Sequence, residues 1–133
     1  MQTDIRWHQR FQQFQQALTL LEEGLKIGQP SLVERAGIIQ FFEMAFELSL
    51  KLLKDYQQAE GLDVNSPRAA IKQAFQLALI ENGHLWMQAL EDRNLTTHTY
   101  NEATAVLVEQ KIRADYVPLL ISLRNDFKAK ISS

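Results

Sequence analysis

Residues 38–53 read IIQFFEMAFELSLKLL, and their apolar side chains fall into two adjacent rows at helical spacing. One row holds Ile38, Phe41, Ala45, Leu48 and Leu52, and the other holds Ile39, Phe42, Phe46, Leu50 and Leu53. A helix with two apolar rows contacts two neighbours at once. This segment is therefore predicted to be the central helix of a bundle. Its charged residues have the spacing of exposed Glu–Lys pairs: Glu43, Glu47, Lys51 and Lys54.

The segments on both sides of this helix are also predicted to be helical. Before it, apolar residues alternate spacings of four and three, and they are Trp7, Phe11, Phe14, Leu18, Leu21 and Leu25. Ser31 and Ser66 stand where they can cap the second and third helices, and Pro67 suits a first helical position.

Shorter patterns predict the remaining helices. The third helix is expected to continue to Asn82-Gly83, with an apolar face of Ile71, Ala74, Phe75 and Ala78. A fourth helix is expected from about His84 to Leu95, and it should unwind at Thr96 and Thr97. Asn101 is expected to cap the next helix. Pro118 should kink or break the last helix between 112 and 118. The fold class is therefore all-α, an up-and-down helical bundle in one domain, 1–133, with a four-helix core and five to six helices in total.

Composition narrows the function classes. The 133 residues include 14 basic and 16 acidic side chains and no cysteine, which excludes disulfides, cysteine nucleophiles and zinc sites with sulfur ligands. The sequence has neither a secretory signal nor an apolar run long enough to cross a membrane, so we expect a cytoplasmic protein with no membrane partner. A slightly acidic chain is also poorly suited to bind long nucleic acids by charge alone.

Common cofactor and metal motifs are missing from the sequence. It has no Gly-rich phosphate loop and no Asp-x-Asp pair after a Gly-Ser turn, so the chain is not itself expected to be a nucleotidyltransferase. One Glu-x-x-His spacing, Glu81 to His84, is interrupted by Asn82-Gly83, whereas a di-iron bundle needs two such motifs and two more glutamates. We therefore expect no metal and no cofactor.

The segment from Glu91 to Asn101 concentrates the reactive side chains. Arg93 can hold a phosphate with two hydrogen bonds, and an imidazole such as that of His98 can take a proton from a ribose 2′-hydroxyl. On an ideal α-helix, residues five apart diverge by about 140°. If the helix unwinds at the threonines, both side chains can turn into one pocket. The alternative is a helix end at which polar residues form caps and His98 has no role.

Arg93-x-x-x-x-His98-x-Tyr100 resembles the RxxxxHxY signature of the HEPN superfamily. Further blocks are similar, in the same order, to its nucleotidyltransferase substrate-binding branch. They are residues 42–48 (FEMAFEL), 51–56 (KLLKDY), Gly61, 66–68 (SPR) and 91–100 (EDRNLTTHTY). The similarity covers nearly the whole chain.

The resemblance implies a HEPN-like helical bundle, the fold of a nucleotidyltransferase substrate-binding subunit, that works with a small separate nucleotidyltransferase encoded nearby. It also implies a homodimer that acts as a toxin by metal-independent cleavage of RNA and is neutralised when the partner adds AMP to the motif tyrosine. Carried over by position, Arg93 would hold phosphate, His98 would be the acid/base catalyst and Tyr100 the modification acceptor. Asp92 and Asn94 would support them.

Two functions are compatible with the sequence. The first is the toxin ribonuclease, and the second is a non-catalytic subunit that binds a substrate or nucleotide for the transferase. Between His84 and Glu102 the sequence holds three acids and one arginine. This local charge disfavours long polyanions and favours short ligands or a site shared between two chains.

Overall fold

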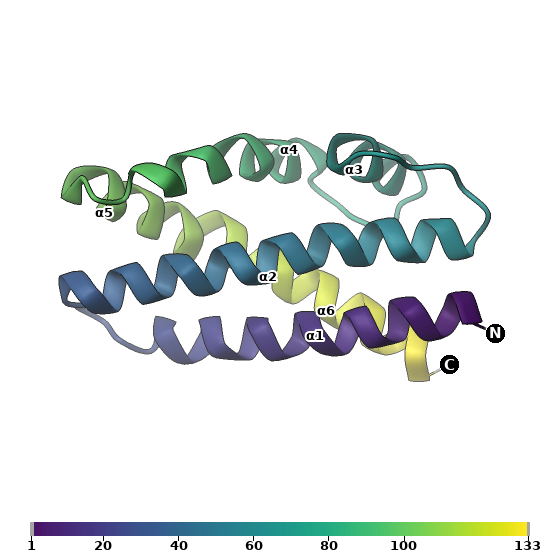
Figure 1. The fold of residues 1–133 in the computed structure, drawn as a ribbon, viewed down its shortest axis with the longest axis horizontal. Coiled ribbons are helices and arrows are strands. Elements are labelled where there is room, and N and C mark those ends of the chain that lie inside the picture. The colour runs from purple at the N-terminus through teal and green to yellow at the C-terminus, as the bar shows by residue number, and fades with distance from the viewer. Residues whose placement is uncertain (1, 133) are drawn as a thin grey trace.

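Six α-helices make up most of the part of the chain that the computed structural model describes, residues 2–132 (Figure 1). They are α1 (Gln2–Leu25), α2 (Leu32–Ala59), α3 (Pro67–Gln76), α4 (Gly83–Asp92), α5 (Glu102–Lys111) and α6 (Val117–Ser132). A 3₁₀ helix, η1 (Arg93–His98), follows α4, and a π-helical turn, η2 (Ile112–Tyr116), joins α5 to α6. No strand forms within these residues, and the all-α prediction is confirmed.

The helices run up and down along one long axis (Figure 1). α1 and α2 lie side by side and antiparallel, and α3 and α4 follow one another along α2 as a broken third leg. From α5 the chain returns through η2 and α6 as the fourth leg. The turn between the third and fourth legs contains η1, and it lies at the end of the bundle where α1 connects to α2.

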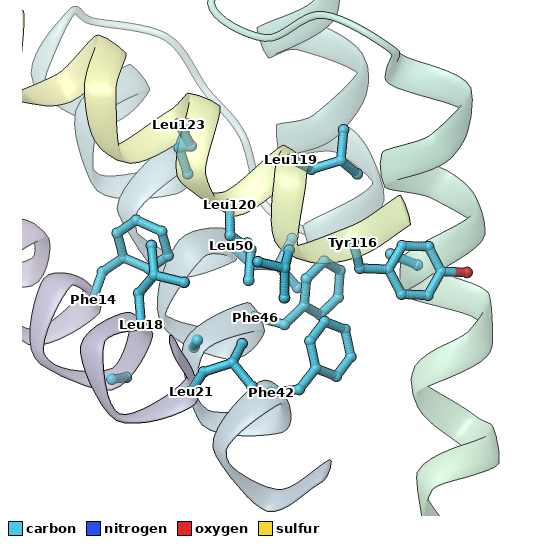
Figure 2. Packing of buried hydrophobic residues seen from close by; sticks show 14 of the residues in the cluster. Phe14, Leu18, Leu21, Phe42, Phe46, Leu50, Tyr116, Leu119, Leu120 and Leu123 are labelled. Carbon is cyan, nitrogen blue, oxygen red and sulfur yellow. The ribbon is translucent and has the colours of Figure 1, made fainter. Parts of the chain in front are cut away.

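Both apolar rows of α2 face the core, with Phe41 and Leu48 partly buried, and α2 contacts α1, α3 and α5 as expected for a central helix. Phe42 and Phe46 stack on each other, and their outer faces meet Tyr116 of η2 and Trp86 of α4, with ring centroids 5.7 and 6.0 Å apart. Figure 2 shows that α1 and α6 complete this cluster with Phe14, Leu18, Leu21, Leu119, Leu120 and Leu123. The core therefore fixes η2 and α4 to the central helix, and α4 leads directly into the candidate motif.

The helix starts follow the capping residues that the sequence predicts. Ser31 and Glu34 form a reciprocal capping box at α2, with hydrogen bonds of 3.1 and 2.9 Å. Ser66 and Asn101 accept the backbone N–H three positions on, at 3.1 and 3.2 Å, and so begin α3 and α5.

α3 ends well before Asn82-Gly83, so the predicted end of this helix is wrong. The Leu79 N–H donates to the Ala74 carbonyl at 2.9 Å, and Ala78 adopts a left-handed conformation with φ +58°. These are the features of a Schellman motif, which ends a helix without needing a glycine. Of the predicted apolar face, Ile71 and Ala74 are buried, whereas Phe75 and Ala78 are exposed, and Gly83 instead begins α4.

Pro118 produces a π-helical turn where the sequence predicts a kink or a break. Pro118 has no N–H to continue the α-helical ladder. The Val117 N–H donates to the carbonyl of Ile112, five residues back, so the chain passes from α5 to α6 through one wider turn. This turn directs Tyr116 into the core.

Candidate functional site

The candidate Arg-x-x-x-x-His motif lies on η1, where α4 unwinds at the threonines as predicted. The Thr96 hydroxyl donates to the Arg93 carbonyl at 2.6 Å, and the Thr97 hydroxyl donates to the Asn94 carbonyl at 2.8 Å. These hydroxyls occupy carbonyls that a continuing α-helix would pair with backbone N–H groups. The sequence thus stops α4 at the position of the motif arginine.

Arg93 is held by a carboxylate of the central helix. Its Nη1 donates to Oε1 of Glu47 at 2.5 Å, and both side chains are partly exposed. No ion pair between Glu47 and Lys51 forms within residues 2–132, so the predicted Glu–Lys pairing of Glu47 is wrong. Helical spacing cannot reveal the true partner because it lies 46 positions away.

Asp92 connects the start of η1 to the fourth leg of the bundle. Its Oδ2 accepts hydrogen bonds from Lys111 Nζ, at 3.0 Å, and from the Tyr116 hydroxyl. Burial, with a further contribution from the hydrogen bond to Asp92, raises the pKa of Tyr116, so this hydroxyl stays a proton donor. Figure 2 shows the Tyr116 hydroxyl pointing out of the apolar cluster. Asp92 thus braces the backbone next to Arg93.

His98 and Tyr100 lie on the solvent side of the turn. Both side chains are exposed, and Tyr100 has 84% of its surface accessible. The two rings meet edge to face with centroids 6.0 Å apart. A reagent that reaches the Tyr100 hydroxyl therefore also comes close to the imidazole.

An open hollow lies beside Arg93 but does not include His98. It is lined by Ser66, Pro67, Arg68, Leu90, Glu91, Arg93 and Asn94. A 3₁₀ helix has three residues per turn, so side chains five apart point about 120° away from each other. Unwinding alone therefore does not turn His98 into the hollow that Arg93 and Asn94 line, contrary to the expectation of one shared pocket.

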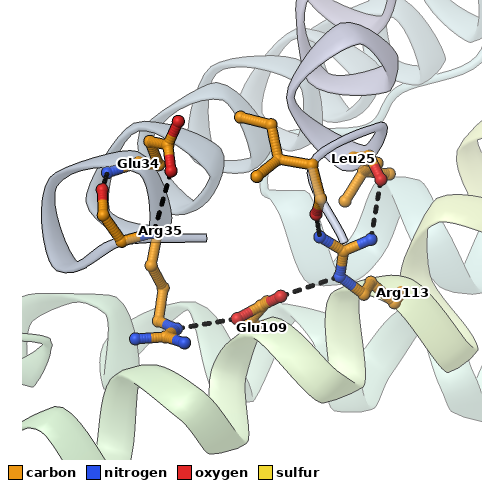
Figure 3. A network of polar contacts seen from close by, with 7 residues as sticks. Leu25, Glu34, Arg35, Glu109 and Arg113 are labelled. Carbon is orange, nitrogen blue, oxygen red and sulfur yellow. Dashed lines mark hydrogen bonds and ion pairs between the residues drawn. The ribbon is translucent and has the colours of Figure 1, made fainter. Parts of the chain in front are cut away.

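A network of ion pairs stabilises the end of the bundle that carries η1 (Figure 3). The Glu109 carboxylate accepts from Arg35 at 2.7 Å and from Arg113 at 2.8 Å, and Arg113 also donates to the carbonyls of Leu25 and Ile27 at 2.8 Å each. Burial acts to raise the pKa of Glu109, but the hydrogen bonds and charges of the two arginines outweigh it and lower that pKa. The network joins the end of α1 to α2 and α5.

In the part of the chain from 2 to 132, no cluster of three or more His, Asp or Glu side chains is arranged to hold a metal ion. None of the helices in the same part combines the length and the hydropathy that a membrane span needs.

Comparison with known proteins gives three similarities. The profile of the family described as "Nucleotidyltransferase substrate binding protein like" matches residues 9–129. A Haemophilus influenzae protein named "Probable ribonuclease HepT" is 34% identical over 92 residues, a match that spans 63% of each chain and so less than two thirds of that protein. A crystal structure of a Thermus thermophilus protein superposes with a TM-score of 0.75 and 32% identity, covering 90% of this chain and 99% of the other.

Proposed function

Because the chain belongs to the nucleotidyltransferase substrate-binding family of the HEPN superfamily, we propose that it is a metal-independent endoribonuclease whose site is completed between two copies. The main support for this proposal is the position of the two motif side chains on η1. Arg93 lines a hollow, whereas His98 faces solvent on another side of the same turn. In a symmetric dimer, the exposed His98 of one copy can approach the hollow of the other.

Within such a site, Arg93 binds the non-bridging oxygens of one RNA phosphate and stabilises the charge that develops on them. The neutral imidazole of His98 takes the proton of the adjacent 2′-hydroxyl as the 2′-oxygen attacks phosphorus. The bond from phosphorus to the 5′-oxygen breaks, and that oxygen takes a proton from solvent. The products are a 2′,3′-cyclic phosphate and a 5′-hydroxyl.

Neighbouring residues keep this arginine in place. Glu47 holds the guanidinium at 2.5 Å, and Asp92 fixes the preceding backbone through Lys111 and Tyr116. Asn94 lines the hollow beside Arg93 and can donate an amide hydrogen bond to a phosphate or a ribose.

Tyr100 is the residue through which a small nucleotidyltransferase partner neutralises this toxin. Its hydroxyl oxygen attacks the α-phosphorus of ATP, the α–β anhydride bond breaks, pyrophosphate leaves, and the hydroxyl proton passes to the partner's base. The 84% exposure of Tyr100 supports access by another protein. The Tyr100 ring lies close to His98, with ring centroids 6.0 Å apart, so an AMP group on Tyr100 adds bulk and negative charge where RNA must approach.

RNA cleavage in the presence of a metal chelator tests the ribonuclease. His98→Ala should lower the rate by at least about 100-fold, because a positioned acid/base group contributes that much or more. Arg93→Ala should also abolish most cleavage. His84→Ala is a matched control, since this exposed histidine lies at the other end of α4, and it should cleave as the unaltered protein does.

An unchanged rate in His98→Ala would overturn the ribonuclease. If the unaltered protein instead cleaves no RNA but binds ATP, and Arg93→Ala removes that binding, the chain is the non-catalytic nucleotide-binding subunit. The partner reaction is tested by incubation with the adjacent nucleotidyltransferase and ATP. A mass gain of one AMP or more should appear, and Tyr100→Phe should prevent it whereas Tyr56→Phe should not.

A further inference from the structure

A second arginine lines the hollow beside η1. Arg68 comes from the first turn of α3, 25 positions before Arg93 in the sequence, and both arginines line the same hollow. The segment between His84 and Glu102 contains only one arginine, Arg93, so the charge of this segment alone does not reveal that Arg68 lines the same hollow. The charged residues that line the hollow are two arginines and one glutamate.

Fold stability does not account for Arg68. Its Nη2 lies 3.9 Å from Oε1 of Glu91, which is too long for a hydrogen bond, and the two side chains are 55% and 67% exposed. Exposed pairs of this kind contribute little to stability. Arg68 also stands in the first turn of α3, where the helix dipole favours anions over cations, and no acidic residue shares that turn.

The rest of the lining suits a nucleic-acid strand. Pro67 and Leu90 provide apolar surface for a ribose or a base edge, and Asn94 offers amide donors and an acceptor. A guanidinium binds phosphate oxygens in pairs, and it stays charged at every physiological pH.

We propose that Arg68 binds the RNA phosphate next to the one held by Arg93, so that the hollow holds two consecutive phosphates of the strand. This inference rests on the proposed function. It identifies a second positive charge for binding RNA, which the motif segment with its single arginine lacks. Arg68 then determines affinity for the strand, whereas Arg93 and His98 act on the bond that is cut.

The test measures binding and cleavage separately. Binding uses a fluorescent, 2′-O-methylated RNA oligonucleotide, which has no 2′-hydroxyl to attack and therefore is not cut. Arg68→Gln should weaken its binding about 3- to 10-fold and reduce the slope of log K against log salt by about one, as expected for one lost phosphate contact. In cleavage assays the same variant should raise KM while kcat stays within about twofold.

Lys72→Gln is the matched control because it removes the same charge one turn later on the same helix, from an exposed residue that does not line the hollow. It should bind the oligonucleotide as the unaltered protein does. Arg68→Lys should recover part of the lost affinity, since it keeps the charge but not the two parallel hydrogen bonds.

Equal binding by Arg68→Gln and the unaltered protein would overturn the proposal, and so would an equal loss in Lys72→Gln. Arg68→Lys binding no better than Arg68→Gln would also contradict a phosphate contact. If no variant cleaves RNA but Arg68→Gln still weakens binding selectively, the ribonuclease fails while the phosphate site at Arg68 stands.

Discussion

Glu47 is a partner of the motif arginine that the motif itself does not include. Its position on the solvent-exposed face of α2 is predictable from helical spacing, but its 2.5 Å hydrogen bond with Arg93 is not. A guanidinium fixed on one side presents its remaining N–H groups to a ligand in a defined direction. If Arg93 binds phosphate as proposed, we expect Glu47 to position it.

Glu47→Ala should lower kcat/KM for RNA cleavage about 10-fold, because a misplaced phosphate-binding group reduces the rate even when it remains present. The free energy of unfolding should change by less than about 1 kcal/mol, since the pair is partly exposed. Urea denaturation and cleavage kinetics on the same samples check both numbers, and Glu47→Gln should recover part of the activity. Full activity in Glu47→Ala would contradict the positioning role.

Glu109 gives the fold a pH dependence that can be measured. Its pKa is lowered in the folded chain, so the stabilisation it provides is complete above its ordinary pKa of 4.5 and is lost as the pH falls through its lower folded value. Glu109→Gln should therefore be less stable than the unaltered protein at about pH 7, and this difference should shrink below about pH 4. Urea midpoints over this range test the sign, and a difference that grows in acid would contradict it.

Among the elements, α2 is the one most fully predicted from sequence. Its two apolar rows and its cap at Ser31 appear in the structure, and the helix ends at Ala59, two residues before the left-handed Gly61. The end of α3 is not predictable in the same way, because Ala78 takes the left-handed position that glycine usually fills. The wider turn before Pro118 is likewise not predictable, because a kink, a break or a π-helical turn can each accommodate the missing N–H of Pro118.

The residues that follow α2 and α3 allow two opposite substitutions to be compared. Gly61 and Ala78 occupy equivalent left-handed positions, with φ +85° and +58°. Ala78→Gly should stabilise the fold by about 0.5 kcal/mol, since relief of the left-handed strain exceeds the added entropy of the unfolded chain. Gly61→Ala should destabilise it by about 0.5–1 kcal/mol for the opposite reason. Thermal unfolding measures both changes, and a less stable Ala78→Gly would show that Ala78 carries no such strain.

At the scale of the whole molecule, the sequence predicts the bundle and the segment that carries the motif, but not the surroundings of the motif. Arg93 contacts Glu47, Asp92 contacts Lys111 and Tyr116, and Arg68 joins the hollow from the start of α3. Each of these neighbours is at least 19 positions away in sequence, so only the packed fold reveals them. Arg93 and His98 still point in different directions after α4 unwinds into the 3₁₀ helix, and His98 does not line the hollow that Arg93 lines.

Mixed dimers test most directly whether Arg93 and His98 act across two copies of the chain. Arg93→Ala and His98→Ala, co-expressed with different tags and purified through both, give dimers with one copy of each. One of the two symmetric sites then has both residues and the other has neither, so cleavage should return to about half of the unaltered rate per dimer. Mixed dimers as inactive as each parent variant would contradict a site shared in this way.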